Sequence, residues 1–284
     1  MGNLAERPAV RGGSQEQDGT MIVDCHTHVR SFDGMAISEH LAAAETVDAC
    51  IVLAAHDGPR DEINRKVAEY VGQHREKMTG FAVVDPTQDR LTNKALTALT
   101  EKLGFKGLVL YCSLNGFHPA HSQAMRFYEV VREMGLPVFF HNGSHNLSAR
   151  AVLEYAQPYL LDEVARVFPD LKIVIGNMGV PFVEQTLAML SKHENVFADL
   201  TIRPSKVWQT YNIVVAACEQ GIMDKLLFGS GSPLGKAGEC IETLLGFNML
   251  LADTKLPTVP RGSIRNVIER DSLELLGIRH GTAG

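Results

Sequence analysis

This sequence lacks the features that mark secreted, membrane-spanning and nucleic-acid-binding proteins. Its five cysteines are odd in number, widely spaced and mostly set in apolar segments, so we expect free thiols and a reducing cytoplasm. No uninterrupted apolar run is long enough to cross a bilayer. There is no basic block, and 33 acidic residues against 27 basic ones give a net charge of -6. Nucleic acid and anionic membranes are therefore not expected as partners.

Nucleotide-binding motifs and a secretory signal are also missing. No GxGxxG follows a predicted strand and no GxxxxGK[ST] occurs, so neither dinucleotide nor P-loop phosphate binding is indicated. The first twenty residues contain Arg7 and Arg11 but no apolar core, which argues against a signal peptide. We interpret residues 1–20 as a flexible extension and residues 21–284 as a single domain. A hydrophobic fraction of 45% is ample for a sizeable core.

What the chain does contain is a regular alternation of apolar runs and helical patterns. Apolar runs predict strands at residues 21–28, 49–54, 78–84, 105–111, 138–141, 172–177, 196–200 and 225–230. Helices are predicted at residues 38–44, 61–74, 91–103, 122–133, 149–168, 182–191, 205–220 and 264–278. Eight apolar strands alternating with helices predict a parallel sheet buried on both faces. Eight is also the number that closes a (β/α)8 TIM barrel.

The first strand ends in two histidines separated by one residue. Because side chains alternate along a strand, His26 and His28 point to the same side, where two imidazoles can bind one divalent cation. Neutral nitrogen donors suit zinc, iron, nickel or cobalt. An isolated pair of this kind is more often two ordinary polar residues leaving a strand. Its place on the first strand of a barrel favours the metal site.

Other polar residues end later strands, and in a barrel these strand ends build the active site. His141 follows the fifth strand, Asn177 the sixth, and Ser230 with Gly231 the eighth. Three imidazoles can hold a metal with an open fourth position, at which the pKa of bound water falls to about 7. We therefore predict one divalent metal, zinc for preference, on His26, His28 and His141.

Five segments, in the same order, resemble those of a known family. They are Val23-Asp24-Cys25-His26-Thr27-His28, Gly104-Phe105-Lys106-Gly107-Leu108, Gly135-Leu136-Pro137-Val138-Phe139-Phe140-His141-Asn142-Gly143, Ile173-Val174-Ile175-Gly176 with Met178-Gly179, and Leu226-Leu227-Phe228-Gly229-Ser230 before Ser232-Pro233. From Met21 to nearly Ile278 the chain resembles the amidohydrolase superfamily, within it the amidohydrolase-2 group of metal-dependent hydrolases and decarboxylases. The resemblance implies a barrel with one divalent metal, commonly zinc, held by the strand-one and strand-five histidines and a strand-eight aspartate.

Two positions depart from the family pattern. Asn177 stands where the family usually has a histidine, and Gly231 stands where it usually has an aspartate. The aspartate normally binds the metal and accepts a proton from the attacking water, so Gly231 removes both an anionic ligand and a base. Asn177 can still donate a hydrogen bond to a substrate oxygen, but it cannot carry a positive charge.

Three outcomes remain open on the sequence alone. The first, which we prefer, is a hydrolase of a small amide, ester or lactone, in which the metal polarises a carbonyl and activates water while Asn177 contacts the oxyanion. Its base would come from elsewhere, with His145 and Asp199 as candidates. The second is a metal-independent lactonase, decarboxylase or other lyase that uses its histidines directly. The third is a catalytically silent barrel that binds a ligand.

The predicted substrate contacts lie on loops beyond the strands. Arg203, after the seventh strand, is the best candidate for holding a carboxylate, because a guanidinium binds such groups bidentately. A surface salt bridge explains it about equally well. His118 lies in a loop on the active-site face and His56 ends the second strand, so both are further candidates. The expected partner is a small-molecule substrate, and a homo-oligomer is left open.

Overall fold

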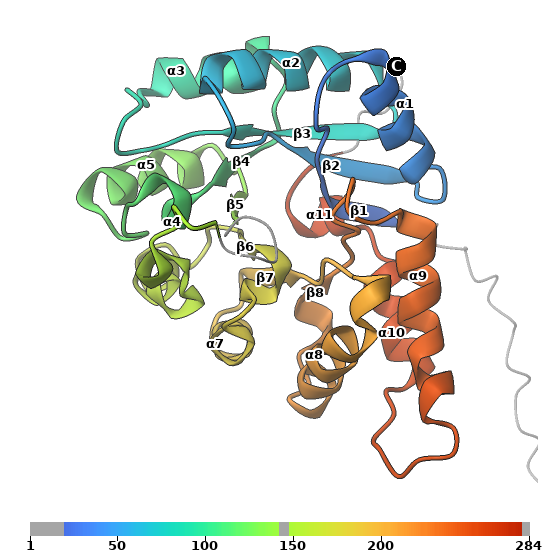
Figure 1. Ribbon diagram of the computed structural model, residues 1–284. Helices are drawn as coiled ribbons and strands as arrows, with labels where there is room; N and C mark the ends of the chain where they lie inside the picture. Colours follow the sequence, from blue (N-terminus) through green and yellow to red (C-terminus); the bar gives the residue numbers. More distant parts are fainter. Residues whose placement is uncertain (1–19, 142–147, 280–284) are drawn as a thin grey trace, which may run out of the picture.

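Eight parallel strands form the centre of the molecule (Figure 1). The computed structural model describes residues 20–141 and 148–279. The strands are β1 (Val23–Thr27), β2 (Ala49–Leu53), β3 (Met78–Val83), β4 (Gly107–Leu110), β5 (Val138–Phe140), β6 (Ile173–Ile175), β7 (Val196–Asp199) and β8 (Leu226–Leu227). Each pairs with the next. The sheet closes because the Cys25 amide donates to the Phe228 carbonyl and the Gly231 amide to the His26 carbonyl, both at 2.9 Å. The predicted (β/α)8 barrel is confirmed.

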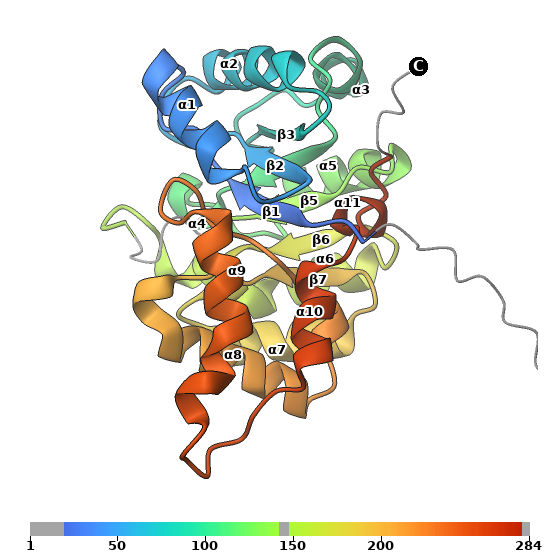
Figure 2. The same ribbon diagram turned by 90° about the vertical axis from the view of Figure 1, so that its right-hand side faces the viewer.

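Helices lie outside the strands (Figures 1 and 2). They are α1 (Gly34–Ala43), α2 (Arg60–Gln73), α3 (Asn93–Thr97), α4 (Cys112–Asn115), α5 (Ser122–Glu133), α6 (Asp162–Val167), α7 (Val183–Lys192), α8 (Val207–Glu219), α9 (Ala237–Gly246), α10 (Arg261–Ile268) and α11 (Ser272–Leu275). Helix α5 begins and ends at the predicted residues. With helices on one face and the barrel interior on the other, the strand residues are almost all buried, which explains their continuous apolar runs. No helix in the described ranges is long and apolar enough to cross a membrane.

The predicted helix over residues 149–168 is wrong for most of its length. Two short 3-10 turns, Leu153–Ala156 and Pro158–Leu161, precede α6, which covers only the last part. Pro158 is the physical reason, because the ring of a proline disfavours the helical conformation of the residue before it. Gln157 accordingly has an extended backbone, with φ -79° and ψ 121°.

The end of the chain also differs from the prediction. In place of one helix over residues 264–278, α10 stops at Ile268 and α11 begins at Ser272. The Asp271 side chain caps α11 by accepting a hydrogen bond from the Glu274 amide at 2.9 Å, so the chain starts a new helix there. Helix α9, which the sequence reading did not anticipate, packs beside α10 (Figure 2).

Candidate metal centre

Three imidazole nitrogens meet at the carboxyl end of the barrel. His26 lies in β1, His28 just beyond it, and His141 directly after β5. The Nε2 atom of His26 is 3.1 Å from that of His28 and 3.0 Å from that of His141, and the remaining Nε2 pair is 3.1 Å apart. Across residues 20–141 and 148–279, this is the only group of three metal-ligand side chains that converge in this way.

Two of these imidazoles are held in the tautomer that a metal requires. The Nδ1 atom of His28 lies 2.9 Å from the Leu53 carbonyl oxygen, which only accepts, so its hydrogen is on Nδ1. The Nδ1 atom of His26 lies 3.1 Å from the Asp199 carboxylate and donates to it. When neutral, both rings therefore direct an Nε2 lone pair toward His141. Lone pairs facing one another repel, and a cation between them removes the repulsion, so the donor set fits a divalent metal.

Burial favours the neutral, metal-binding form of two of the three imidazoles. It lowers the pKa of His28 to about 3, with the His26 ring adding to the effect. Burial also lowers the pKa of His141 well below its ordinary value, with His26 and His28 as further causes. Since a metal ligand must be an unprotonated imidazole, His28 and His141 are in the metal-binding form at neutral pH.

Asp199, the last residue of β7, is fully buried and joins three parts of the site. Besides His26, it accepts hydrogen bonds from the Thr201 hydroxyl and, at 2.7 Å, from the Asn177 amide. Burial by itself raises the pKa of Asp199. The His26 charge and these hydrogen bonds outweigh it and hold the pKa below its usual value. A Cβ on Gly229 would lie 2.8 Å from the Asp199 carboxylate, so glycine is needed there.

The chain after β6 takes an uncommon path that delivers the Asn177 amide to Asp199. Asn177, Met178 and Gly179 have φ values of 53°, 50° and 62°. The left-handed region costs about 1 kcal/mol or more for a residue with a Cβ, although asparagine tolerates it better than most. Such strain persists where surrounding contacts fix it, as the Asp199 carboxylate does here. Asn177 as a whole is buried, with 5% of the residue exposed.

The position of the missing aspartate is shaped for glycine. Gly231 has φ +63°, and a Cβ there would lie 2.5 Å from the Thr201 methyl carbon. Thr201 is itself buried, has φ 39°, and places its hydroxyl 3.0 Å from Nδ1 of His26. The space that an aspartate side chain would need is therefore filled by Thr201, whose hydroxyl contacts His26 at the same nitrogen as Asp199.

A pocket of about 850 Å³ opens onto the triad. His28 and His141 line it, together with His56, the Tyr111 ring and three cationic side chains, Arg30, Lys66 and Arg150. The Tyr111 ring centroid lies 4.9 Å from that of His141 and 5.4 Å from that of His56. Among the described residues of the lining, Asp57 is the only acid, and its side chain is fully exposed. The pocket therefore favours a small anion.

Comparison with known proteins agrees with this geometry. A protein-family model described as amidohydrolase matches residues 23–248. The chain belongs to the amidohydrolase family. The match begins at the first residue of β1 and includes His26, His28 and His141.

Solved structures of a probable hydrolase and of decarboxylases have the same fold. A probable 2-pyrone-4,6-dicarboxylic acid hydrolase from Acinetobacter baumannii, with citric acid bound, is 18% identical with a TM-score of 0.65, over 90% of this chain and 99% of that one. A 2,6-dihydroxybenzoate decarboxylase from Rhizobium is 13% identical with a TM-score of 0.63, over 91% and 99%. A dihydroxybenzoic acid decarboxylase from Polaromonas, with bound manganese, is 14% identical with a TM-score of 0.59, over 91% and 97%. No curated protein matches the sequence.

Of the other residues predicted from the sequence for this amidohydrolase, some line the triad pocket and others do not. His56 lines the triad pocket, and its Nε2 atom is 2.7 Å from the Asn115 side-chain oxygen. His118 lines a different pocket, beside Tyr159, and does not border the triad pocket. Arg203 is half-buried near Asp199 and Cys240, also away from the lining of the triad pocket. His145 lies outside the described residues.

Sequence reading missed several residues of the amidohydrolase site. Thr201 is separated from Asp199 by one residue, and only the barrel shows that its methyl group occupies the Gly231 side. Tyr111 is the last residue before α4 and reads as the end of an apolar strand. Arg30 and Arg150 are ordinary surface cations in sequence, with no local pattern to single them out. Only the structure identifies Arg30 and Arg150 as site residues, because they come from loops after β1 and β5 that line the same pocket.

Proposed function

We propose that this amidohydrolase is a metal-dependent hydrolase of a small amide, ester or lactone that carries a carboxylate. The observation that carries the proposal is the set of three converging Nε2 atoms at the edge of a cationic pocket. When bound, a divalent metal, zinc for preference, polarises a substrate oxygen and lowers the pKa of water. Manganese is the main alternative metal, because a decarboxylase of the same fold contains it.

The protein's own part in catalysis begins with the orientation of the ligands. The Leu53 carbonyl and the Asp199 carboxylate hold the Nδ1 hydrogens of His28 and His26, which fixes both rings and their tautomers. Asp199 also adds negative charge behind His26 and makes that imidazole a stronger donor. Because Asp199 meets His26 at Nδ1, it lies on the side of the ring that faces away from the converging Nε2 atoms. We therefore assign it a positioning role instead of the base predicted from sequence.

Substrate binding is assigned to the cationic side of the pocket. Lys66 is paired with Glu62 at 2.6 Å, whereas neither Arg30 nor Arg150 forms an ion pair within the described ranges. These two guanidinium groups are available for a carboxylate, which each can bind bidentately. His56 can add a hydrogen bond, and the Tyr111 ring gives the substrate an apolar wall. Arg203 and His118 stay predictions for contacts outside this pocket.

The proton taken from water needs an acceptor, and Gly231 provides none. Of the described residues that line the pocket outside the triad, His56 is the only imidazole. We propose an imidazole as the acceptor, either His56 or His145. Asn177 does not line this pocket, although its backbone amide is held by Asp199, so contact between its side chain and the oxyanion stays a prediction from the sequence.

Decarboxylation is the second candidate function, and one feature of the site favours it. Loss of carbon dioxide needs no base to activate water, so the strand-eight aspartate is not required for that purpose. The C–C bond breaks, its electron pair stays on the substrate carbon, and that carbon takes up a proton, which the His56 imidazole can donate. The same cationic pocket would then hold the carboxylate that leaves. The same three imidazoles and a metal would serve this reaction as well as hydrolysis.

The test is a comparison of products on one substrate panel. Purified protein is incubated with lactones, esters, amides and aromatic carboxylates, and both new acid groups and released carbon dioxide are measured. Hydrolysis should produce new acid groups without carbon dioxide, whereas decarboxylation should release carbon dioxide without new acid groups. In either case, loss of turnover when a chelator is added would support a role for the metal. Absence of metal-dependent turnover across the panel contradicts the proposal.

The cationic pocket is tested with a pair of matched variants. Arg150→Gln should raise KM about tenfold for carboxylated substrates and leave uncharged analogues unaffected, because one charge-assisted hydrogen-bond pair is lost. Arg126→Gln removes a cation from α5, outside the pocket, and should change neither. An equal effect of both substitutions would mean that only net charge matters.

A further inference from the structure

A second cavity, of about 1050 Å³, lies at the opposite end of the barrel from the triad. It reaches Ala49 and Met78, the first residues of β2 and β3, and Lys106, directly before β4. Its walls come from α2, from the π-helical turn Ala98–Lys102 that continues α3, and from the end of the chain around α11. Because catalytic sites of such barrels lie at the carboxyl ends of the strands, this cavity is separate from the metal centre.

The lining of this cavity, which we call the amino-end cleft, is rich in positive charge. Six cations border it against three acids, in a chain whose net charge is -6; the cations are Arg65, Arg75, Lys77, Lys102, Lys106 and Arg279, and the acids are Glu69, Glu76 and Glu101. Within residues 20–141 and 148–279, none of the six cations takes part in an ion pair. Unpaired like charges around one cavity repel, and an anion between them relieves this.

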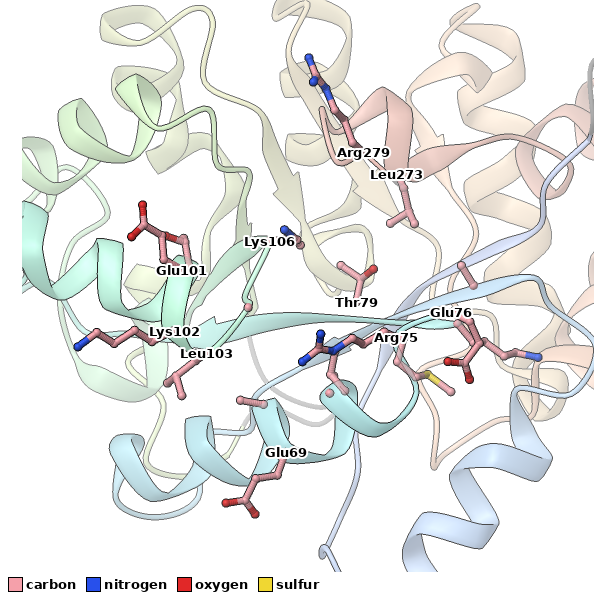
Figure 3. Close-up of a pocket in the computed structure, with 18 of the residues that line it drawn as sticks. Glu69, Arg75, Glu76, Thr79, Glu101, Lys102, Leu103, Lys106, Leu273 and Arg279 are labelled. Atoms are coloured by element: carbon pink, nitrogen blue, oxygen red, sulfur yellow. The ribbon is translucent and has the colours of Figure 1, made fainter. Parts of the chain in front are cut away.

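The lining of the amino-end cleft contains both charged and apolar side chains. Figure 3 shows Arg75, Thr79 and Lys106 in the middle of the view, with Glu69 and Glu101 toward its edge. The cleft also has an apolar floor, by which we mean the half-buried apolar side chains of its lining, among them Val71 and Leu103. Guanidinium and ammonium groups that line the same cleft as apolar side chains match a ligand with a multiply charged group and an apolar body.

We propose that the amino-end cleft binds a phosphorylated small molecule of about the size of a nucleotide. Arg75 and Lys106 hold the phosphate groups, the Thr79 hydroxyl donates to a phosphate oxygen, and the ring or chain of the ligand covers the apolar floor. The volume of about 1050 Å³ lies just above the range of about 300–1,000 Å³ for small-molecule sites. Recognition of phosphate by arginine and lysine uses charge-assisted hydrogen bonds and needs no metal.

The test is binding of pyrophosphate, ATP and adenosine to the metal-loaded protein, measured by isothermal titration calorimetry. We expect saturable binding of ATP and weaker binding of adenosine. Arg75→Gln with Lys106→Gln should weaken ATP binding at least tenfold. Lys94→Gln with Arg126→Gln makes the same change in net charge on helices α3 and α5, outside the lining of the cleft, and binding should be unchanged.

A second double variant separates the cleft from the cationic pocket at the triad. Arg30→Gln with Arg150→Gln should leave ATP binding intact. Loss of binding in this variant alone would place the ligand at the triad pocket and overturn the proposal, as would equal losses in all three double variants or no binding of either phosphate compound at millimolar concentration. Pyrophosphate binding as tightly as ATP would support the cationic groups but remove the assigned role of the apolar floor.

Discussion

The two sides of the metal centre differ in what their polar groups contact. On the side of β1 and β5, three histidines keep the geometry of a metal site, with two rings held by acceptors behind them. On the side of β6 to β8, the groups that usually complete the site are replaced, and the polar contacts converge on Asp199 instead. We call the first the intact side and the second the altered side. The altered side still supports metal binding, because the Asp199 carboxylate accepts a hydrogen bond from the metal-site residue His26.

The largest effect on activity and metal content is expected from removing one of the three histidines on the intact side. His141→Ala should lower kcat/KM by roughly 1,000-fold and remove most of the bound metal, because two imidazoles alone leave the ion weakly held. Activity and metal content are measured on the same preparation. His121→Asn, which changes an exposed histidine at the start of α5 to another good N-cap residue, should alter neither. Full metal content in His141→Ala would show that the triad is not the binding site.

A smaller effect is expected from the carboxylate that links the two sides. Asp199→Asn keeps the shape but loses the charge behind His26, so metal affinity should fall by about 10- to 100-fold. Competition with a chelator measures it. Asp85→Asn is the matched control, because Asp85 is also fully buried but follows β3 and hydrogen-bonds to Thr87 there. Unchanged affinity in Asp199→Asn would leave Asp199 with a structural role only.

Restoring the usual aspartate tests why the altered side departs from the family pattern. Gly231→Asp should destabilise the fold by roughly 2–4 kcal/mol, because it combines a left-handed backbone with the close approach to the Thr201 methyl group. Adding Thr201→Ser removes that methyl group, keeps the hydroxyl, and should recover about half of the loss. Urea unfolding provides the free energies.

Gly277→Asp supplies the control for backbone strain alone. Gly277 has φ +77°, and apart from its two chain neighbours no residue of the described ranges has a heavy atom within 4 Å of the position that a Cβ would take there. Its substitution should therefore cost only about 1 kcal/mol. A cost in Gly231→Asp no larger than that in Gly277→Asp would remove the steric explanation for the glycine.

The smallest effect concerns a buried histidine outside the site. Burial, with His74 as a lesser cause, lowers the pKa of His40 to about 4 from 6.5. Between these values the unfolded chain binds a proton that the folded chain does not, so stability falls as the pH drops from about 6.5 to about 4. His40→Gln can keep a hydrogen bond with the Tyr70 hydroxyl, at 2.7 Å from Nδ1 in the native protein, but does not titrate. Its loss of stability over this window should be smaller by on the order of 1–2 kcal/mol.

Urea unfolding at pH 6.5 and pH 4 measures this difference, with the metal removed in every sample. His121→Asn should follow the native protein, since His121 is exposed. An identical pH dependence in His40→Gln and the native chain would contradict the assignment. His40 thereby differs from the triad, where burial has the same effect on the pKa of His28 but a metal can take the place of the proton.

Sequence patterns anticipated the fold better than the site. Continuous apolar runs located all eight strands, because both faces of a barrel strand are buried, and the strand ends placed His26, His28 and His141 together. Two predicted helices were wrong because a single residue, Pro158 in one and Asp271 in the other, interrupts the helix. Periodicity does not reveal such interruptions, although the proline is a local signal that should have ended the helix.

Contacts between distant loops could not be predicted in the same way. Asp199 was noticed as a polar residue at a strand end, yet its orientation toward Nδ1 of His26 depends on the register of β7 against β8 and on Gly229. Arg30 and Arg150 carry no sequence signal, since a surface cation and a substrate-binding cation look alike until the pocket brings them together. The packing of Thr201 against Gly231 is likewise a property of the closed barrel.

Elemental analysis tests most directly whether His26, His28 and His141 hold one divalent metal. The native protein and His26→Ala are purified without added metal and then exchanged into buffer with equimolar zinc or manganese. We predict about one equivalent in the native protein and less than about a tenth in the variant. Less than about a tenth of an equivalent of any transition metal in both, before and after the addition, would contradict this assignment.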